Sequence, residues 1–360
     1  MHLIVTRTFP PEVGGMQNLM YGLAKSLAEN VMIKVFADQY PNQYNFDKEL
    51  SFSIERVGGP KILRKYRKSY LINQYLKKNN NIKCIIADHW KSLELIKSNN
   101  KKICLIHSKE INHKKGSRLN LKVLDVLNKV DYVIANSQYT MNLAIDLGVI
   151  NKKLIVINPG VDPVKKIEKK FIDEADKILN NKYPKLITVS RFDKRKNHEK
   201  VIMALRNLKQ IYPNILYLCI GYGEEEDNLK KLVKELKLNE QVIFLNNINQ
   251  DLKNALVAQS DVFVMPTIVH KKSVEGFGIA YVEAAQYGIP SIGGKDGGAS
   301  DAIKHSETGI ICDGNNLYEI ISSIELILKD NLKKQLGIKA KEYAKNFEWN
   351  RIIQEYLKIL

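Results

Sequence analysis

Short apolar runs alternate with longer amphipathic stretches along this chain. The short runs are rich in β-branched residues and lack polar interruptions, a pattern typical of strands that are buried on both faces of a parallel sheet. The stretches between them, for example Met16–Glu29 and Asp227–Leu236, carry apolar residues at helical spacing. The runs that we expect to form strands are Leu3–Thr6, Val31–Ala37, Lys83–Ala87, Ile103–Ile106, Tyr132–Asn136 and Leu154–Ile157 in the first half, and Leu186–Ser190, Leu216–Ile220, Val242–Leu245, Val262–Met265, Ser291–Gly293 and Ile310–Cys312 in the second.

These two series of strands and helices predict an α/β protein made of two doubly wound domains. The length of 360 residues agrees with this prediction, since a domain has roughly 100–200 residues. A predicted strand ends at Asn158-Pro159-Gly160, where turn residues precede a lysine-rich stretch. We therefore place the domain boundary there.

The composition is that of a globular protein with a sizeable core. Hydrophobic residues make up 44% of the chain and charged residues 26%, which excludes extensive disorder. No run approaches the roughly 18 apolar residues of a membrane span, and the first residues read as a buried strand rather than a secretory leader. We therefore expect a cytoplasmic protein. The cysteines form no CxxC pair and are expected to be reduced, mostly buried thiols: Cys84, Cys104, Cys219 and Cys312.

The chain is strongly basic, because 56 Lys and Arg residues against 39 Asp and Glu residues give a net charge of +17. Such a surface favours anionic partners such as nucleic acid, anionic lipid or phosphorylated substrates. A general lysine bias of the composition explains the charge equally well. A non-enzymatic nucleic-acid binder is one alternative, although no nucleic-acid-binding module is recognisable in the sequence.

Candidate binding residues follow the first strand of each half. In doubly wound sheets, ligands bind at the carboxyl ends of strands, where helix N-termini point into a crevice. Gly14 and Gly15 come just before a predicted helix and would let the backbone approach an anion closely, the alternative being a simple glycine turn. Arg191 and Lys196 lie five residues apart, and both side chains suit phosphate groups. The alternative for this second segment is a solvated basic loop.

The segment from Ser273 to Pro290 combines a glycine-rich turn with a short apolar helix. Because eight helical residues span about two turns, we expect Glu275 and Glu283 to lie roughly on one side, one at the mouth of a site and one deeper. A carboxylate in such an apolar helix needs partners. Ligand hydroxyl groups are candidates, since a carboxylate can accept hydrogen bonds from both groups of a vicinal diol.

Taken together, these motifs resemble those of the family-4 glycosyltransferases, in the family's order and over nearly the whole chain. The set consists of the Gly14-Gly15 loop, His107 in His-Ser-Lys-Glu, the Asn-Pro-Gly-Val-Asp segment at 158–162, Arg191 with Lys196, and Glu275 with Glu283. The resemblance implies a retaining enzyme of the GT-B fold, with two Rossmann-like domains, an interdomain cleft and a nucleotide-diphosphate sugar as the donor substrate. It further implies that residues 1–160 and a C-terminal helix at about 345–360 bind the acceptor, and that residues 161–344 bind the donor.

The resemblance also implies roles for individual residues. Arg191 and Lys196 would bind the donor diphosphate and stabilise the charge that develops on the leaving group. Glu275 would bind hydroxyl groups of the donor sugar, Glu283 those of the ribose, and His107 would lie near the reacting sugar. The expected catalytic residues are therefore His107, Glu275, Arg191 and Lys196, and the expected donor-binding residues are these last three with Gly14, Gly15, Gly276, Phe277, Gly278, Ile279 and Glu283.

Two positions depart from the family pattern. Ser108 replaces the usual Gly after the histidine, and Asn246 stands where a Gly often follows the strand beside the base pocket. The nucleotide base is therefore left open, and a structural role is the alternative for His107. In the family, the leaving phosphate is thought to help take the acceptor proton, so Glu275 and Glu283 are not expected to act as a glycosidase pair. No Asp-x-Asp motif occurs, and we expect neither a metal nor another cofactor.

A basic segment from Lys61 to Tyr70 carries Ile62, Tyr66 and Tyr70 at helical spacing. A basic helix with such a stripe is typical of a membrane-surface element, the alternative being a stripe packed on the domain. A second basic tract lies at His113–Arg118, and together the two tracts favour a lipid or lipid-linked acceptor reached at the inner face of an anionic membrane. The membrane-contact candidates are Lys61, Arg64, Lys65, Arg67 and Lys68.

The sequence thus predicts a metal-independent hexosyltransferase that acts on a lipid, lipid-linked or glycan acceptor. The opening Phe-Pro-Pro-Glu-Val-Gly-Gly and the loop from Thr267 to Val274 most resemble the phosphatidylinositol mannosyltransferase branch. This branch suggests GDP-mannose as the donor, while a UDP-sugar stays open. A nucleotide-sugar epimerase of similar shape is the alternative enzyme, since it would keep a diphosphate site but need no acceptor.

Overall fold

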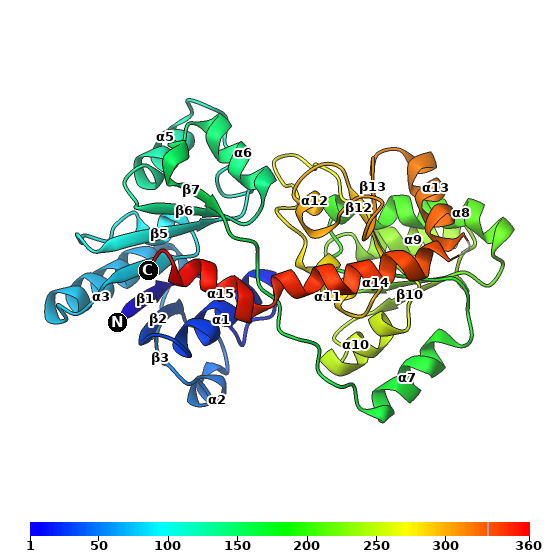
Figure 1. The fold of residues 1–360 in the computed structure, drawn as a ribbon, viewed down its shortest axis with the longest axis horizontal. Coiled ribbons are helices and arrows are strands. Elements are labelled where there is room, and N and C mark those ends of the chain that lie inside the picture. Colours follow the sequence, from blue (N-terminus) through cyan, green and yellow to red (C-terminus); the bar gives the residue numbers. More distant parts are fainter. Residues whose placement is uncertain (330) are drawn as a thin grey trace. The chain divides into compact units, whose positions relative to one another are not determined.

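The computed structural model describes residues 1–329 and 331–360, and the side chain of Lys61 lies outside its described part. The chain forms two compact units (Figure 1). Unit 1 comprises Met1–Asp162 and Phe347–Leu360, and unit 2 comprises Pro163–Asn346. These limits lie two residues from the expected domain limits at both joins.

Unit 1 is built on a seven-stranded parallel sheet of order β3-β2-β1-β4-β5-β6-β7. Its strands are β1 (His2–Val5), β2 (Ile33–Asp38), β3 (Ser53–Val57), β4 (Cys84–Ala87), β5 (Lys101–Ile106), β6 (Tyr132–Ala135) and β7 (Leu154–Val156). Its helices are α1 (Gly15–Ala28), α2 (Gln43–Lys48), α3 (Arg64–Lys78), α4 (Trp90–Leu93), α5 (Arg118–Leu127), α6 (Gln138–Leu147) and α15 (Trp349–Leu357). Helices α1 and α15 cover one face of the sheet, and α3 to α6 cover the other.

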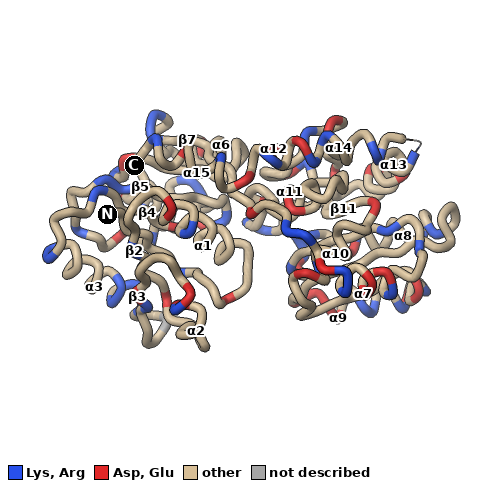
Figure 2. The backbone as a smooth tube through the Cα atoms, turned by 60° about the horizontal axis from the view of Figure 1, so that its bottom comes forward, with Lys and Arg blue, Asp and Glu red and all other residues tan. Residues whose placement is uncertain are grey.

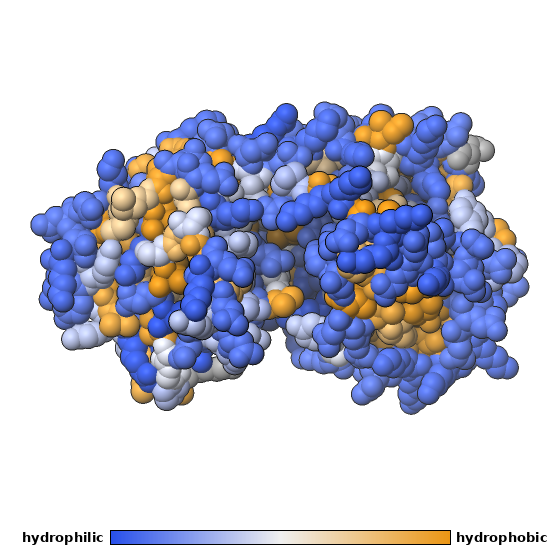
Figure 3. All heavy atoms as spheres, turned by 90° about the horizontal axis from the view of Figure 1, so that it is seen from below, coloured by the Kyte–Doolittle hydropathy of each residue, from blue (hydrophilic) through white to orange (hydrophobic). Residues whose placement is uncertain are grey.

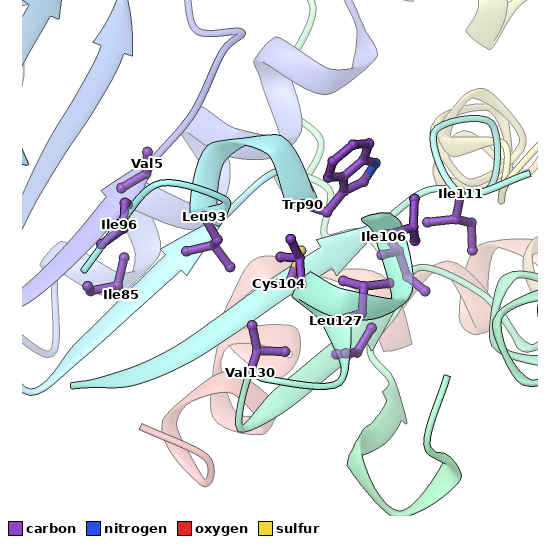
Figure 4. Close-up of a cluster of buried hydrophobic side chains, with 14 of the residues drawn as sticks. Val5, Ile85, Trp90, Leu93, Ile96, Cys104, Ile106, Ile111, Leu127 and Val130 are labelled. Carbon is purple, nitrogen blue, oxygen red and sulfur yellow. The ribbon is translucent and has the colours of Figure 1, made fainter. Parts of the chain in front are cut away.

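The central strands of unit 1 are buried on both faces. Leu3 and Val5 of β1 belong to one hydrophobic cluster, whereas Ile4 between them belongs to the other. A sheet covered on both sides therefore requires the unbroken apolar runs seen in the sequence. Figure 4 shows part of the first cluster, in which side chains of the sheet gather with Trp90 and Leu93 of α4.

Trp349 fixes the C-terminal helix α15 to unit 1. Its side chain is buried, and a Cβ atom added to Gly22 of α1 or to Gly160 would lie 2.3 Å from the ring. The chain is also held there by the backbone, since Val161 N–H donates to Phe347 O at 2.8 Å and Trp349 N–H donates to Val161 O at 3.1 Å. The C-terminal segment is thus an integral part of this unit.

Unit 2 is built on a six-stranded parallel sheet of order β10-β9-β8-β11-β12-β13. Its strands are β8 (Lys185–Val189), β9 (Leu216–Ile220), β10 (Val242–Leu245), β11 (Val262–Met265), β12 (Ser291–Gly294) and β13 (Gly309–Cys312). Its helices are α7 (Lys169–Leu179), α8 (His198–Ile211), α9 (Glu226–Glu235), α10 (Gln250–Ala258), α11 (Ile279–Gln286), α12 (Ala299–Ala302), α13 (Leu317–Leu328) and α14 (Leu332–Ala344).

The predicted fold class of two doubly wound α/β domains is confirmed. All predicted strands form, with ends shifted by at most two residues. Strand β3 was not predicted, because its Ser-Ile-Glu-Arg-Val sequence carries charged residues that an edge strand tolerates. In both sheets the winding reverses at one point, between β1 and β4 and between β8 and β11. The carboxyl ends of the strands leave a crevice at such a point.

The basic residues are not confined to one patch of the surface. Lys and Arg residues are spread over both units (Figure 2), and hydrophilic side chains cover most of the face drawn in Figure 3, with smaller apolar patches between them. All four cysteines are buried and none is in a disulfide, as predicted. Among the described residues, no helix combines the length and apolar character that crossing a bilayer requires.

Candidate functional site

A buried cluster of charged groups lies at the winding reversal of unit 2. The Lys196 ammonium group and the Arg195 guanidinium group both donate to Oε2 of Glu275, the arginine at an Nη1–Oε2 distance of 2.6 Å. The three side chains are only 10–12% exposed. Lys196 Nζ also lies 3.5 Å from the Sδ atom of Met265, the last residue of β11. Two of the predicted catalytic residues, Lys196 and Glu275, are therefore in direct contact.

The two cations keep Glu275 ionised. Burial by itself would raise the pKa of this carboxyl, but the charges and hydrogen bonds of Lys196 and Arg195 outweigh burial and lower the pKa to about 2. Burial in turn lowers the pKa of Lys196, although Glu275 acts in the opposite direction. The site thus holds a carboxylate that can accept hydrogen bonds at neutral pH.

The loop after β8 is shaped to carry these cations. Asp193 accepts a hydrogen bond from Lys196 N–H at 3.2 Å and so caps a single 3-10 turn. Asn197 follows with φ of +62°, a backbone conformation that Asn tolerates better than most residues. Its Nδ2 donates to Pro266 O at 2.8 Å and to Gly314 O at 2.7 Å, which ties the loop to the segments that follow β11 and β13.

Arg195 was not among the residues predicted for the site, whereas Arg191 was. The Arg191 side chain is 70% exposed, and the ion pair that it forms is with Asp193 at 3.7 Å, not with the Glu275 cluster. Both arginines belong to one basic run, Arg191-Phe-Asp-Lys-Arg195-Lys196, and no local pattern in it indicates which side chains turn inward. A donor role for Arg191 stays a prediction.

The glycine-rich turn before α11 is built as a helix N-terminus. Gly278 caps the helix with φ of +91°, and a Cβ atom there would lie 2.4 Å from the ring of Tyr281, so only Gly fits. Phe277 is buried beside it, Tyr281 N–H donates to Gly278 O at 3.0 Å, and the N–H groups of Ile279 and Ala280 lie at the start of the helix, before its internal hydrogen bonds begin. Gly276 lies directly between Glu275 and this turn. The arrangement can bind an anion through backbone N–H groups.

The loop after β12 supports Glu275 from the other side. Gly298 N–H donates to Glu275 O at 2.8 Å, and a Cβ atom added to Gly297 would lie 2.5 Å from the same oxygen. This loop was not predicted as part of the site. The only sequence signal for it is the pair of glycines after a strand, which is common in turns.

The two glutamates of the predicted pair differ from expectation. Glu275 lies in the turn before α11 rather than on the helix, and it is the more buried of the two. Glu283 lies on α11 itself, is 38% exposed, and has Lys253 of α10 as its ion-pair partner at 3.7 Å. The expectation that one helix carries both residues is therefore wrong, because the helix begins four residues after Glu275. That the two glutamates lie on one side of a site stays a prediction.

In unit 1, the glycine loop after β1 leaves open space at a helix N-terminus. Gly14 caps α1 with an extended backbone, and Gly15 is the first helical residue. In the part of the chain that the structure describes, no atom lies within 4 Å of a Cβ atom added to Gly15. The structure itself therefore does not require Gly at this position, which is consistent with a requirement set by a ligand.

His107 follows β5 at the same edge of the sheet, in a turn that Glu110 closes by accepting the His107 N–H. Its Nε2 atom is buried and has no hydrogen-bond partner among the described residues, and His107 lines a cavity of about 10 Å³ together with Asn136. Ser108, which replaces the family's usual Gly, adopts φ of +88°, a conformation that favours glycine. Ser108 therefore carries local backbone strain that a glycine would not.

The basic side chains of segment 61–70 were predicted to contact a membrane, but those described in the structure make contacts within the protein. Lys68 is buried, where its ammonium group donates to Thr6 O and contacts Asp38 Oδ1, both at 2.6 Å, so it cannot contact a membrane. The remaining basic side chains are also occupied: Arg64 donates to Gly59 O at 3.0 Å, Arg67 donates to Gly58 O at 3.0 Å, and Lys65 pairs with Glu94 at 2.7 Å. The side chain of Lys61, the remaining membrane-contact candidate, lies outside the described part of the structure.

The aromatic stripe of the same segment is exposed. Ile62, Tyr66 and Tyr70 are 85%, 58% and 63% exposed, which excludes the alternative that the stripe packs on the domain. An exposed apolar stripe of this kind indicates an interaction surface. The apolar residues of the predicted membrane-surface segment are therefore exposed, whereas one of its basic residues, Lys68, is buried and stabilises the fold.

Within residues 1–329 and 331–360, no group of three or more His, Cys, Asp or Glu side chains is placed to hold a metal ion. The side chains of Lys196 and Arg195 place two positive charges near the candidate donor site.

Comparison with known proteins places these features in context. Residues 13–165 match the family model described as Glycosyltransferase Family 4, and residues 169–347 match the one described as Glycosyl transferases group 1. A similar curated protein is the GDP-mannose-dependent alpha-(1-6)-phosphatidylinositol monomannoside mannosyltransferase of Mycolicibacterium smegmatis, with 24% identity over 96% of this chain and 94% of that one. The corresponding monoacylated-substrate enzyme of Corynebacterium glutamicum is 25% identical over 92% of this chain and 90% of its own.

Solved structures show the same fold. A crystal structure of Anabaena HepE in complex with UDP superposes with a TM-score of 0.83 at 20% identity, with all of both chains covered. This likeness confirms the predicted GT-B architecture. The relatives give no support to an epimerase or to a nucleic-acid binder.

Proposed function

Because the chain belongs to the glycosyltransferases that join a family 4 domain to a group 1 domain, and is thus a hexosyltransferase, we propose that it transfers a hexose with retention from a nucleotide-diphosphate sugar to a lipid or lipid-linked acceptor. Unit 2 would bind the donor and unit 1 the acceptor. The observation that carries this proposal is the contact of Lys196 and Arg195 with Glu275, beside the N-terminus of α11.

The chemistry of this cluster suits a sugar diphosphate. Glu275 is held ionised and can accept hydrogen bonds from sugar hydroxyl groups. Lys196, with Arg191 reaching in from the surface, would neutralise the charge that develops on the leaving diphosphate, which stabilises the transition state. The N–H groups at the start of α11 offer further donors to the phosphates.

The remaining predicted residues complete the proposed site. Glu283 would bind the ribose hydroxyl groups, and Gly15 would let the backbone of α1 approach the phosphates, since the space above it is open. His107 would lie near the reacting sugar. The leaving phosphate would take the acceptor proton, so that the reaction needs no metal and no paired acid and base.

The donor and acceptor classes rest on the names of the relatives. The Mycolicibacterium enzyme is named for GDP-mannose and a phosphatidylinositol mannoside, a Campylobacter jejuni relative is named for a diphospho-undecaprenol-linked acceptor, and HepE was crystallised with UDP. We therefore propose a lipid or lipid-linked acceptor and leave guanine and uracil as the two candidate bases. We also propose a cytoplasmic enzyme that adsorbs to the inner membrane face through the exposed stripe of α3 and the residues before it.

Thermal unfolding in the presence of UDP, GDP, UDP-sugars and GDP-mannose tests the donor site. A ligand at 100 times its dissociation constant stabilises the folded state by about 2.7 kcal/mol, enough to raise the melting temperature measurably. We expect stabilisation by one nucleotide-sugar, and its loss in Glu283→Ala and Arg191→Ala. Glu235→Ala is the matched control, since Glu235 forms an exposed ion pair on α9. No stabilisation by any nucleotide would refute the proposal.

A further inference from the structure

Four polar side chains form a continuous hydrogen-bonded network in the core of unit 2. Ser190 Oγ lies 2.9 Å from His198 Nε2, and His198 Nδ1 lies 2.9 Å from the Tyr217 hydroxyl oxygen. Tyr217 is in turn 2.8 Å from Thr188 Oγ1, and the Thr188 hydroxyl donates to Val264 O. The network therefore joins the neighbouring strands β9, β8 and β11 to the first residue of helix α8.

The donors of this network can be assigned by counting protons. A carbonyl oxygen only accepts, so the Thr188 proton is used by Val264 O, and Thr188 accepts from the Tyr217 hydroxyl. The Tyr217 oxygen then accepts from His198 Nδ1–H, which leaves Nε2 as the acceptor for the Ser190 hydroxyl. This direction satisfies all four hydrogen bonds with the one proton that each side chain offers.

The ring of His198 is neutral, as this assignment requires. His198 is 2% exposed, and burial, followed by the charge of Lys196, lowers its pKa to about 3. The Phe192 ring packs against it edge-on, with the ring centroids 4.9 Å apart, and Thr188 and Tyr217 are fully buried. Because buried polar groups need hydrogen-bond partners, each of these side chains depends on the network.

The hydrogen bond between Ser190 and His198 closes the loop that follows β8. Ser190 comes directly after β8, His198 is the first residue of α8, and residues 191–197 lie between them. This loop carries Arg191 and Lys196, the two residues proposed to bind the donor diphosphate. Ser190 Oγ is also 3.2 Å from Arg191 O, the longer of its two contacts. A side-chain bond between the two ends of the loop restricts its shape before any ligand binds, which lowers the entropic cost of binding.

The imidazole also supports the middle of the loop. Phe192 N–H donates to Tyr222 O at 2.9 Å, and Glu225 N–H donates to Phe192 O at 3.0 Å. The Phe192 ring rests on His198, so this histidine contacts the loop at its start and through its first buried side chain. The pairing of β8 with β9 uses backbone hydrogen bonds instead. Loss of the imidazole should therefore change the loop more than the sheet.

We propose that His198 is a positioning residue: by holding Ser190, it fixes the loop 191–197 in the shape that binds the donor diphosphate. The role requires no contact between the imidazole and the donor. The inference rests on the proposed function and deepens it, because a fixed loop matters for binding only if the loop binds the donor.

Amide hydrogen exchange of the full chain, without any donor, tests the loop directly. Ser190→Ala removes the hydroxyl at the partly buried end of the network, so it should fold but exchange at residues 191–197 at least tenfold faster than the wild type. Ser190→Thr keeps a hydroxyl and should restore slow exchange. Ser322→Ala is the matched control, because its hydroxyl donates to Glu319 O at 3.2 Å within helix α13. Unchanged exchange in Ser190→Ala would overturn the proposal.

Calorimetric titration with UDP-glucose and GDP-mannose gives the second measurement. For the donor that the wild type binds, Ser190→Ala and His198→Asn should each weaken binding at least tenfold, and Ser190→Thr should restore it. His198→Asn keeps an amide N–H for Tyr217 but does not reach Ser190. The double variant should bind as weakly as each single variant, because both changes break the same hydrogen bond. A lower melting temperature with unchanged donor affinity would show a merely structural histidine and overturn the proposal.

These outcomes are distinct from failure of the proposed function. A wild-type protein that binds no nucleotide-sugar refutes the proposed function, and donor positioning by His198 with it. Donor binding that all variants retain, or losses of affinity that add in the double variant, would overturn the positioning role alone.

Discussion

Arg195 Nη1 lies 2.6 Å from Glu275 Oε2 although the two residues are 80 positions apart in the chain. The same oxygen also accepts a hydrogen bond from Lys196. One carboxylate therefore balances two buried cations, and it joins the loop after β8 to the turn before α11. A change at Glu275 should consequently affect both the folding of unit 2 and donor binding, and the two effects can be separated.

Glu275→Gln should destabilise unit 2 by about 3 kcal/mol, because Lys196 loses its ion-pair partner and Arg195 keeps only Asp193, at 3.6 Å. Glu283→Gln should change the free energy of unfolding by less than about 1 kcal/mol, since its ion pair is partly exposed and 3.7 Å long. Both variants should lose donor binding. Urea unfolding followed by circular dichroism measures the difference. Equal stability of the two variants would contradict the structural role of Glu275.

The stability of unit 2 should depend on pH through Glu275. Its pKa is about 2 in the folded protein, below the ordinary value of 4.5 for a glutamate. The folded-state pKa is the lower one, so the stabilisation is fully present above about pH 4.5 and is lost as the pH falls toward 2. We expect the free energy of unfolding of the wild type to fall more steeply over this range than that of Glu275→Gln. Parallel pH profiles of the two proteins would contradict the assignment.

Gly15→Ala should separate ligand binding from folding. No atom lies within 4 Å of the added methyl group, and Ala is favoured over Gly in a helix by up to about 1 kcal/mol, so stability should stay the same or rise. If the donor phosphates approach this backbone, the methyl group should weaken nucleotide-sugar binding at least tenfold. Calorimetric titration with the donor checks this. Full affinity in a stable variant would show that the donor does not approach α1.

Lys68→Met should destabilise unit 1 by about 3 kcal/mol, because it removes the buried partner of Asp38 and the hydrogen bond to Thr6 O. Both tryptophans, Trp90 and Trp349, belong to unit 1, so their fluorescence during urea unfolding reports on this unit. Lys78→Met should leave the curve unchanged, since Lys78 is exposed. A stable Lys68→Met protein would argue that the ion pair contributes nothing to folding.

Tyr70→Ser should weaken binding to vesicles that contain anionic lipid while leaving unfolding unchanged, because its ring is 63% exposed. Tyr70 belongs to the exposed stripe with Ile62 and Tyr66, so this variant probes the proposed membrane surface. Co-sedimentation with the vesicles gives the affinity. Tyr318→Ser, which alters a 76% exposed tyrosine of unit 2, is the matched control. Equal losses in both variants would point to a nonspecific effect.

Much of the architecture follows from the sequence because it depends on local pattern. Unbroken apolar runs such as Leu216–Ile220 can be satisfied only between two layers of helices, and they form strands where predicted. Gly278 marks a helix N-terminus for the same reason, since its positive φ and the close approach of the Tyr281 ring are local requirements. The edge strand β3 escaped prediction because an edge accepts charged residues that a central strand excludes.

The tertiary structure alone decided which charged side chains are buried. Arg191 and Arg195 share one basic run, and Lys68 shares another with Lys65, so residue type and spacing do not tell them apart. A buried charge is stable only where a counter-charge and hydrogen bonds repay its lost hydration, and those partners come from distant segments: Glu275 for Arg195, and Asp38 with Thr6 for Lys68. Local pattern therefore determines which elements form, and long-range contacts determine which of their charges face a ligand and which hold the fold together.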